Sequence, residues 1–278
     1  RGNAYVVFGF DTGAVTHQGS SADERILGDG GANDIVLGQG DDTFSSGRGD
    51  DVVRGGAGRD RGGLGSGDDV AFGGAGDDVL NGGPGDDMLY GEDGIDRMRL
   101  GGGADTAFGG AGNDVFYERA DELGAGDKLY GGEGLADTLI VLSPGVLDLT
   151  ALDVFAGIER VRIAANQQIT STDADLKWTG RSGSETYNLG DGQDVVRAGG
   201  GNDVILGGGG NDTLVGHGGD DRIQGGAGTD KIVGSSGADV FIFAPGSEID
   251  IVFDFENGID LIPKFENSDS RGIPKFRG

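Results

Sequence analysis

The stretch DDVAFGGAGDDVLNGGPGDDMLYGEDGID, residues 68–96, repeats one short pattern along its whole length. Paired glycines lead to aspartates, and a single apolar residue follows two positions after the aspartate that keeps the beat. That beat is nine residues, because Asp69, Asp78, Asp87 and Asp96 are evenly spaced. A fixed short period predicts a solenoid, in which each repeat is one structural unit stacked on its neighbours.

The same pattern fills two blocks of the chain. Asp34 lies before the regular series, one residue short of the nine-residue spacing to Asp42. Asp127 and Asp137 follow the series after small insertions. The candidate aspartates are Asp34, Asp42, Asp51, Asp60, Asp69, Asp78, Asp87, Asp96, Asp105, Asp114, Asp127 and Asp137 in the first block, and Asp194, Asp203, Asp212, Asp221, Asp230 and Asp239 in the second. The apolar residues that accompany them, such as Leu80 and Ile205, are predicted to form the core.

Nine residues divide into about six of turn and three of strand, and two such units make one flattened coil. Stacked coils pair their strands in parallel at about 4.8 Å, so the predicted fold class is all-β. Every second aspartate then falls on the same flank. One row contains Asp42, Asp60, Asp78, Asp96 and Asp114, and the other contains Asp51, Asp69, Asp87 and Asp105.

Such rows need a counter-charge. The chain carries a formal charge of −27, and two carboxylates about 5 Å apart cost roughly 3 kcal/mol at an effective dielectric near 20. Calcium fits because it takes six to eight oxygens and accepts backbone carbonyls, whereas magnesium demands stricter geometry. Pairs of aspartates one coil apart predict roughly 8–14 calcium ions and folding coupled to binding. The candidate carbonyl ligands are Gly73, Gly74, Gly76, Gly82, Gly83, Gly85, Gly207, Gly208 and Gly210.

Composition narrows the partners further. The acidic balance disfavours nucleic acid and anionic lipid, which both require a basic surface. The chain has no cysteine, hence no thiolate metal site, and no apolar run near the roughly 18 residues of a membrane span. It starts at Arg1 rather than Met, and we expect a fragment or processed chain. His17 and His217 are the only histidines, and no HExxH or GxSxG motif is present, so we predict no catalytic site in this chain.

The units GGAGDDVLN (73–81), GGPGDDMLY (82–90), GGAGNDVFY (109–117) and GGAGTDKIV (225–233) match the pattern GGxGxDxUx. The chain therefore resembles the RTX (repeats-in-toxin, hemolysin-type) calcium-binding family. That resemblance implies a right-handed parallel β-roll that is unfolded at low calcium. It also implies type I secretion from a Gram-negative bacterium, a secreted or cell-surface location, and a covalently attached cargo domain on the N-terminal side.

Some positions depart from the repeat. Gly62 stands where an apolar residue is expected and predicts an underfilled turn, and His217 replaces a glycine. Residues 118–130 interrupt the nine-residue spacing, so the sequence does not decide whether ions bind near Asp114 and Asp127.

The predicted organisation has five parts: an N-terminal remnant or cap (1–25), a first calcium block (26–140), a β-rich connector (141–187), a second calcium block (188–242), and a C-terminal cap and tail (243–278). The connector is expected to continue the solenoid without calcium, with a strand at 158–163, a helical turn near 150–156 and Trp178 as a packing anchor; an independent small domain is the alternative. Residues 2–13 weakly resemble an FG-GAP repeat. Asp254 and Asp260 are candidate ligands in the cap.

Three functions remain open from the sequence. The first is a non-catalytic calcium-binding module that folds outside the cell and stabilises a cargo or aids its secretion. The second is a calcium-dependent structural or adhesive protein of a surface or matrix, with self-association. The third is an accessory part of a secreted enzyme, because the catalytic status of a longer parent protein is not decided by this chain.

Overall fold

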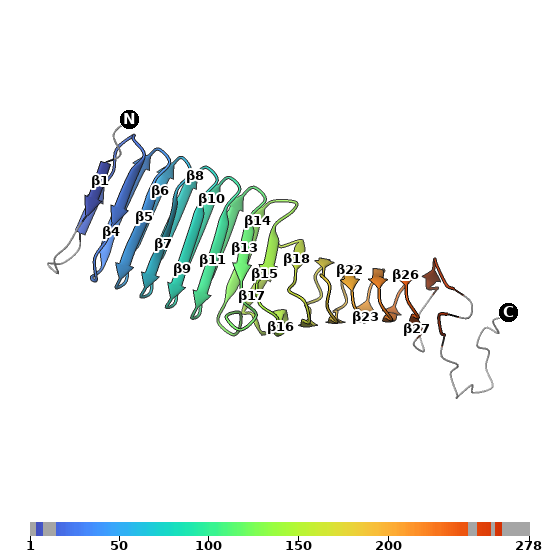
Figure 1. Cartoon of the computed structure of the whole chain (residues 1–278). Coiled ribbons are helices and arrows are strands. Elements are labelled where there is room, and N and C mark those ends of the chain that lie inside the picture. Colours follow the sequence, from blue (N-terminus) through green and yellow to red (C-terminus); the bar gives the residue numbers. More distant parts are fainter. Residues whose placement is uncertain (1–3, 8–14, 244–248, 257–258, 263–278) are drawn as a thin grey trace.

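The computed structural model describes residues 4–7, 15–243, 249–256 and 259–262, and it is built of parallel strands stacked along one axis (Figure 1). The longest sheet has fourteen strands: β1 (Ala4–Val7), β3 (Glu24–Leu27), β5 (Thr43–Arg48), β7 (Arg61–Ser66), β9 (Val79–Pro84), β11 (Arg97–Gly102), β13 (Val115–Glu118), β15 (Thr138–Val141), β18 (Arg160–Arg162), β20 (Lys177–Thr179), β22 (Val195–Gly200), β24 (Thr213–Gly218), β26 (Lys231–Ser236) and β28 (Ile251–Val252).

Two shorter sheets form the other side of the coils. The first has eight strands: β2 (Val15–Gln18), β4 (Asn33–Gln39), β6 (Val52–Ala57), β8 (Val70–Ala75), β10 (Met88–Asp93), β12 (Thr106–Ala111), β14 (Lys128–Glu133) and β17 (Val154–Ala156). The second has six strands: β16 (Val146–Asp148), β19 (Gln168–Thr170), β21 (Thr186–Asn188), β23 (Val204–Gly209), β25 (Arg222–Ala227) and β27 (Val240–Ile242).

The predicted all-β solenoid is confirmed, and the connector is part of it. The fourteen-stranded sheet runs without a break from β13 through β15, β18 and β20 to β22, so the connector is not an independent domain. On the other side one sheet ends and the next begins: after β15 the chain forms β16 and the 3-10 turn η1 (Leu149–Ala151), then returns to pair β17 with β14. The helical turn expected near 150–156 is thus present only at its start, because residues 154–156 form β17, and β18 lies within the strand expected at 158–163.

The turns depend on glycines that adopt backbone angles which residues with a side chain adopt only rarely and with strain. Gly74 has φ 109° and Gly76 has φ 137°, and glycines at the second and fourth positions of the other repeats have similar angles. At such angles a side chain is strained, so glycine allows the chain to bend twice within one repeat. Between the turns, strand side chains alternate between the core and the surface; β9, for example, buries Leu80 and leaves Asn81 exposed.

The core is a narrow row of apolar side chains, one from most repeats, including Leu80, Leu89 and Ile205. The expected gap at Gly62 is filled, because the Phe44 ring of the neighbouring strand lies 2.5 Å from the point where a Cβ would stand. In the connector the core is larger: Trp178 and Tyr187 are fully buried and meet edge to face, with ring centroids 6.3 Å apart. Trp178 is thus the packing anchor that the sequence predicted.

The outer face of the eight-stranded sheet carries a ladder of rings. Phe72, Tyr90, Phe108 and Tyr130 stack on successive strands with centroids 4.6–5.0 Å apart. Because these rings come from equivalent positions of consecutive coils, they add cross-strand stabilisation and hold the strands in register.

The two ends extend the same solenoid. Strand β1 pairs with β3, and β28 pairs with β26. The FG-GAP resemblance at residues 2–13 extends to residues outside the described part of the chain. Among the described residues, no helix has the length and apolar character needed to span a membrane.

Candidate metal centre

The predicted rows of aspartates are present as two hydrogen-bonded ladders, one on each flank of the solenoid. Asp78 Oδ1 accepts the backbone N–H of Asp60 at 2.7 Å, and Asp96 Oδ1 accepts that of Asp78 at 2.8 Å. On the other flank, Asp87 Oδ1 accepts the N–H of Asp69 at 2.9 Å. Each bond joins residues 18 apart, which is one coil. One oxygen of each carboxylate therefore holds the stack together.

The second oxygen of these carboxylates is buried and accepts no hydrogen bond within the described residues. This holds for Asp42, Asp51, Asp60, Asp69, Asp78, Asp87, Asp96, Asp105, Asp114, Asp137, Asp194, Asp203, Asp212, Asp221, Asp230 and Asp239. A buried oxygen of this kind costs about 1–3 kcal/mol, and more when it is charged. A repeated cost at the same atom indicates a ligand that satisfies it.

The first glycine of the repeat leaves room beside that oxygen. A Cβ on Gly73 would lie 2.4 Å from Asp78 Oδ2 and 2.7 Å from the carbonyl oxygen of Gly91 on the next coil. A carboxylate oxygen and a carbonyl oxygen therefore converge on one place that only glycine leaves free. The same convergence occurs beside Gly55, Gly82, Gly91, Gly109, Gly131, Gly207 and Gly216.

Several ladder carboxylates, among them Asp60, Asp78, Asp87 and Asp96, have a pKa above that of free aspartate. Burial raises the pKa of Asp60 and Asp78 to about 6 and that of Asp87 and Asp96 to about 7. The backbone N–H bonds lower these pKa values and neighbouring carboxylates raise them, but burial is the largest cause. A cation beside Oδ2 would reverse this balance, because opposite charge favours the ionised form.

This donor set fits calcium. Carboxylate and carbonyl oxygens are its preferred ligands, and it tolerates irregular geometry. Across the described residues, no three His, Cys, Asp or Glu side chains gather as an all-side-chain metal site. An ion in the solenoid would therefore draw on the backbone as well, as the sequence predicted for the glycine carbonyls.

The predicted glycine carbonyls take two positions. The Gly73 carbonyl lies beside Asp60 Oδ2, across the space left by Gly55. The carbonyls of Gly76, Gly83, Gly85, Gly208 and Gly210 lie against the equivalent glycine of the next coil. For all nine predicted glycines, Gly74, Gly82 and Gly207 included, the role as carbonyl ligand stays a prediction.

Some repeats carry a side chain where the others have the first glycine. Leu37, Leu64, Leu100 and Leu189 occupy this position and are buried in the core. Ser46 and Ala198 are the smaller cases. The flanking aspartates still have an unpartnered oxygen, but an apolar side chain replaces the free space beside it.

Asp34 is not brought into either ladder. It lies on the surface of β4, where it forms an ion pair with Arg54 at 2.6 Å. Asn33 takes the ladder position instead, and its N–H donates to Asp51 Oδ1 at 2.7 Å. The Asn33 side-chain amide donates to the Ser46 carbonyl at 3.2 Å, the carbonyl equivalent to Gly91 beside Asp78. Here an amide satisfies the oxygen that an ion would bind elsewhere.

The ladders also extend beyond the predicted aspartates. Glu159 accepts the N–H of Asp137, and Glu185 donates its own N–H to Asp203 while its side chain accepts the N–H of Asn166. In the cap, Asp250 and Asp260 accept the N–H groups of Asp230 and Asp239. The sequence analysis named Asp260 but missed the others. Spacing close to 18 residues would have found Asn33 and Glu185.

Where a repeat has two adjacent aspartates, such as Asp68 and Asp69, the first of them lies outside the ladder and stabilises the outer turn. Asp68 is exposed, and its Oδ1 accepts the N–H of Asp86 on the following coil at 3.0 Å. Its neighbour Asp69 is buried and accepts the N–H of Asp51 on the preceding coil. In these adjacent pairs, only the second aspartate belongs to the ladder and to the candidate sites.

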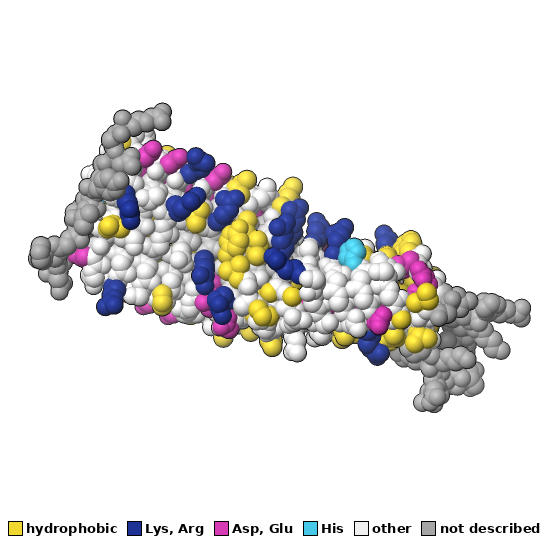
Figure 2. Space-filling model, in the orientation of Figure 1, with side chains coloured by type: hydrophobic (Ala, Val, Ile, Leu, Met, Phe, Trp, Pro, Cys, Tyr) yellow, Lys and Arg dark blue, Asp and Glu magenta, His cyan; other side chains and the backbone are white. Residues whose placement is uncertain are grey.

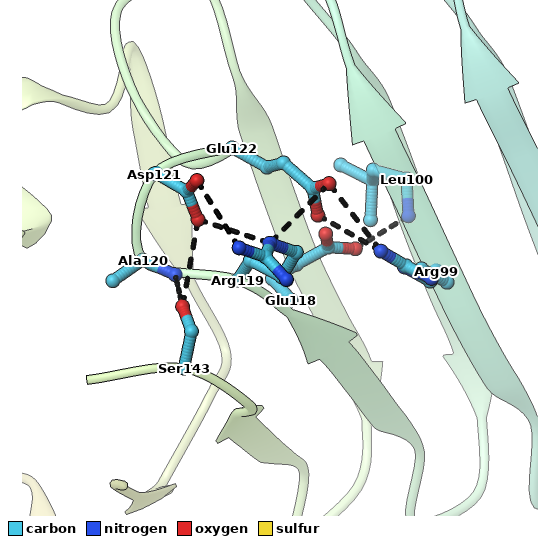
Figure 3. A network of polar contacts seen from close by, with 8 residues as sticks. All are labelled: Arg99, Leu100, Glu118, Arg119, Ala120, Asp121, Glu122 and Ser143. Carbon is cyan, nitrogen blue, oxygen red and sulfur yellow. Dashed lines mark hydrogen bonds and ion pairs between the residues drawn. The ribbon is translucent and has the colours of Figure 1, made fainter. Parts of the chain in front are cut away.

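At residues 118–130 the ladders continue, since Asp127 and Asp137 accept the N–H groups of Asp105 and Asp114, and a network of further polar groups lies beside them (Figure 3). Glu118 is buried, and its side chain accepts the N–H of Leu100. Burial raises the pKa of Glu118 to about 8, so it keeps its proton at neutral pH. Arg99 pairs with Glu122 at 3.1 Å. Both oxygens of Asp127 are occupied, since they accept the N–H groups of Asp105 and Gly124.

Parallel coils joined by buried carboxylates and glycine carbonyls define a calcium-binding β-roll. A protein-family model described as RTX calcium-binding nonapeptide repeat (4 copies) matches residues 19–61, 64–98, 90–117, 179–214 and 206–241, more than half of the chain. The chain therefore belongs to the RTX calcium-binding nonapeptide-repeat family. A search of curated proteins finds no match to it.

Proposed function

We propose that this chain is a non-catalytic module that folds on binding extracellular calcium and thereby stabilises an attached cargo or aids its secretion. The observation that carries the proposal is the row of buried Oδ2 atoms that accept no hydrogen bond within the described residues, many of which face the space beside a first glycine. Calcium between consecutive coils supplies the missing partner. It also offsets most of the formal charge of −27 that keeps the unfolded chain expanded.

The ligands proposed are the ladder aspartates together with carbonyls of the next coil. Sites beside a first glycine, such as those of Asp78, Asp87 and Asp114, have both kinds of oxygen in place. Sites beside Leu64 or Leu100 have an apolar side chain there and bind calcium more weakly. The number of ions is thus set by the glycines as well as by the aspartates.

Far-UV circular dichroism tests the folding switch. The chain in EDTA should give a coil spectrum, and titration to about 10 mM calcium should convert it to a β spectrum, while the same magnesium concentration should not. A β spectrum already present in EDTA would contradict coupled folding.

The role toward a cargo needs its own measurement. A reporter domain fused to the N-terminal side should resist protease better in calcium than in EDTA, whereas a reporter added as a separate chain should not change. Equal protection of the fused and separate reporters would contradict stabilisation through attachment. Secretion is tested by export of the fused reporter from cells that carry a type I system.

A further inference from the structure

The outer face of the connector carries four exposed cations on three consecutive strands. Arg160 and Arg162 lie on β18, Lys177 on β20 and Arg197 on β22. We call these four residues the basic face. The residues that alternate with them, including Trp178, are buried in the core, so the basic face rests on rigidly packed strands.

The sheet register brings these cations together. Arg160 lies directly opposite Lys177, and Thr179 lies between Arg162 and Arg197 on neighbouring strands. Figure 2 shows blue side chains gathered over this middle part of the solenoid, next to a yellow group. The outward positions of β18, β20 and β22 contain no acidic residue.

Within the described residues, the cations of the basic face have no ion-pair partner, as is also true of several cations that stand apart from one another. In the described part of the chain, Arg54, Arg59, Arg99 and Arg119 each form an ion pair with an acidic side chain, but no member of the basic face does. Like charges directly opposite each other destabilise a sheet. A chain with a formal charge of −27 has many acids to place there, so stability does not account for the basic face.

The surroundings restrict the shape of a ligand. Each strand offers two outward positions, about 7 Å apart. The turn that leads into β20 carries the exposed carboxylates Asp173 and Asp175, and the turn that follows β20 carries the exposed Arg181. In register with Arg162 along the axis lie Ile140 and then Tyr117, both half-buried. The surface is therefore a narrow lane, basic at one end and apolar at the other, with an acidic turn along one flank.

We propose that this lane binds a linear acidic polysaccharide that lies along the solenoid axis. Guanidinium groups bind carboxylate or sulfate through paired hydrogen bonds, and the apolar faces of sugar rings can pack on Tyr117 and Ile140. A duplex or a membrane is wider than the lane and would bring its phosphates against the turn that carries Asp173 and Asp175. Binding requires only a folded solenoid, so the proposal goes beyond the role of calcium.

The test uses the calcium-folded chain and hyaluronan fragments, a linear probe with regularly spaced carboxylates, with neutral dextran of the same length as the control ligand. Arg160, Arg162, Lys177 and Arg197 are replaced together by serine. A matched variant replaces four exposed, unpaired cations elsewhere: Arg25, Arg61, Arg222 and Lys231. Affinity measured by calorimetry should fall at least about tenfold for the basic-face variant and change less than about twofold for the matched one.

Circular dichroism and the calcium midpoint should be unchanged in both variants, which separates loss of binding from loss of folding. Equal weakening in both variants would overturn the proposal, because it would indicate general charge attraction. So would equal binding of dextran, or binding of anionic vesicles or duplex DNA but not of hyaluronan. The proposal would also be overturned if the wild type did not bind hyaluronan but self-associated, and if only the basic-face variant lost this self-association. The basic face would then bind a second copy of the chain.

Discussion

The repeat block from β4 to β12 and the connector from β15 to β21 build the same coils from different side chains. In the block, ladder positions hold aspartates such as Asp78 and Asp87. In the connector the equivalent positions include Gln167 and Leu176, both buried. The connector adds Trp178 to its core, whereas the block has residues as small as Ala71 and Ala107 at core positions.

This difference shows two ways to stabilise one coil. Apolar burial contributes roughly 25 cal/mol per Å², and the large side chains of the connector supply it directly. The core side chains of the block are smaller, and its glycine entropy and its charge oppose folding. We therefore expect its coils to depend on a cation and the connector coils to depend on packing.

The largest expected effect comes from a variant of the repeat block whose stability is measured both with calcium and in EDTA. Asp78→Asn with Asp87→Asn should lower the number of bound calcium ions by about two and destabilise the calcium form by roughly 2.7 kcal/mol per ion at about 100 times the dissociation constant. In EDTA the same variant should be more β-structured than the wild type, because charge is removed and asparagine can bond the carbonyl as Asn33 does. Calorimetry and circular dichroism measure both effects.

Trp178→Ala is the matched change in the connector. The lost packing should cost about 3–5 kcal/mol in calcium, with the ion count per folded chain unchanged. A fall in calcium stoichiometry for Trp178→Ala, or destabilisation of the asparagine variant in EDTA, would show that the two regions do not differ in this way.

A smaller change tests the site without touching a carboxylate. In Gly82→Ala the new Cβ would stand 2.4 Å from Asp87 Oδ2 and 2.5 Å from the Leu100 carbonyl oxygen. We expect the loss of about one ion and a calcium midpoint shifted to higher concentration. Gly102→Ala is the control, because its Cβ would meet no atom within 4 Å. If both alanine variants bound the same number of ions as the wild type, the space beside the first glycine would not be the site.

The pH dependence should also differ between the two ion conditions. Burial raises the pKa of Asp60 and Asp78 to about 6 and that of Asp87 and Asp96 to about 7 in the fold, above the ordinary value of 3.8. The folded chain then binds more protons than the unfolded one, so without calcium stability is greatest at acid pH and is lost as pH rises through 6 to 7.

We therefore expect the calcium-free chain to gain β signal when the pH is lowered from about 8 to about 5, and the calcium midpoint to rise over the same change because protons compete for the oxygens. Circular dichroism at each pH measures both. A calcium-free spectrum that does not change with pH would indicate that these carboxylates are not buried together.

Most of the fold and most of the ladder residues could be predicted from the nine-residue repeat, because this spacing fixes which side chains share a flank. What it missed has physical causes. The coil repeats at 18 residues, so the register selects Asn33 rather than Asp34. An insertion hides Asp250, and a change of residue type hides Glu185. The exchange of sheets at β16 and β17 depends on three-dimensional pairing, which no spacing in the sequence encodes.

The smallest expected effect concerns a turn that lacks its glycine. His217 has φ 76°, in the left-handed region, and it stands opposite Gly199. This backbone costs a residue with a side chain roughly 1–2 kcal/mol, so His217→Gly should stabilise the calcium form by about 1 kcal/mol and raise its melting temperature by about 2–4 °C. His217→Ser keeps the strain and should leave the melting temperature unchanged. If serine stabilised the chain as much as glycine, the gain would come from removing the imidazole, and the second glycine of the repeat would not be required for its backbone angle.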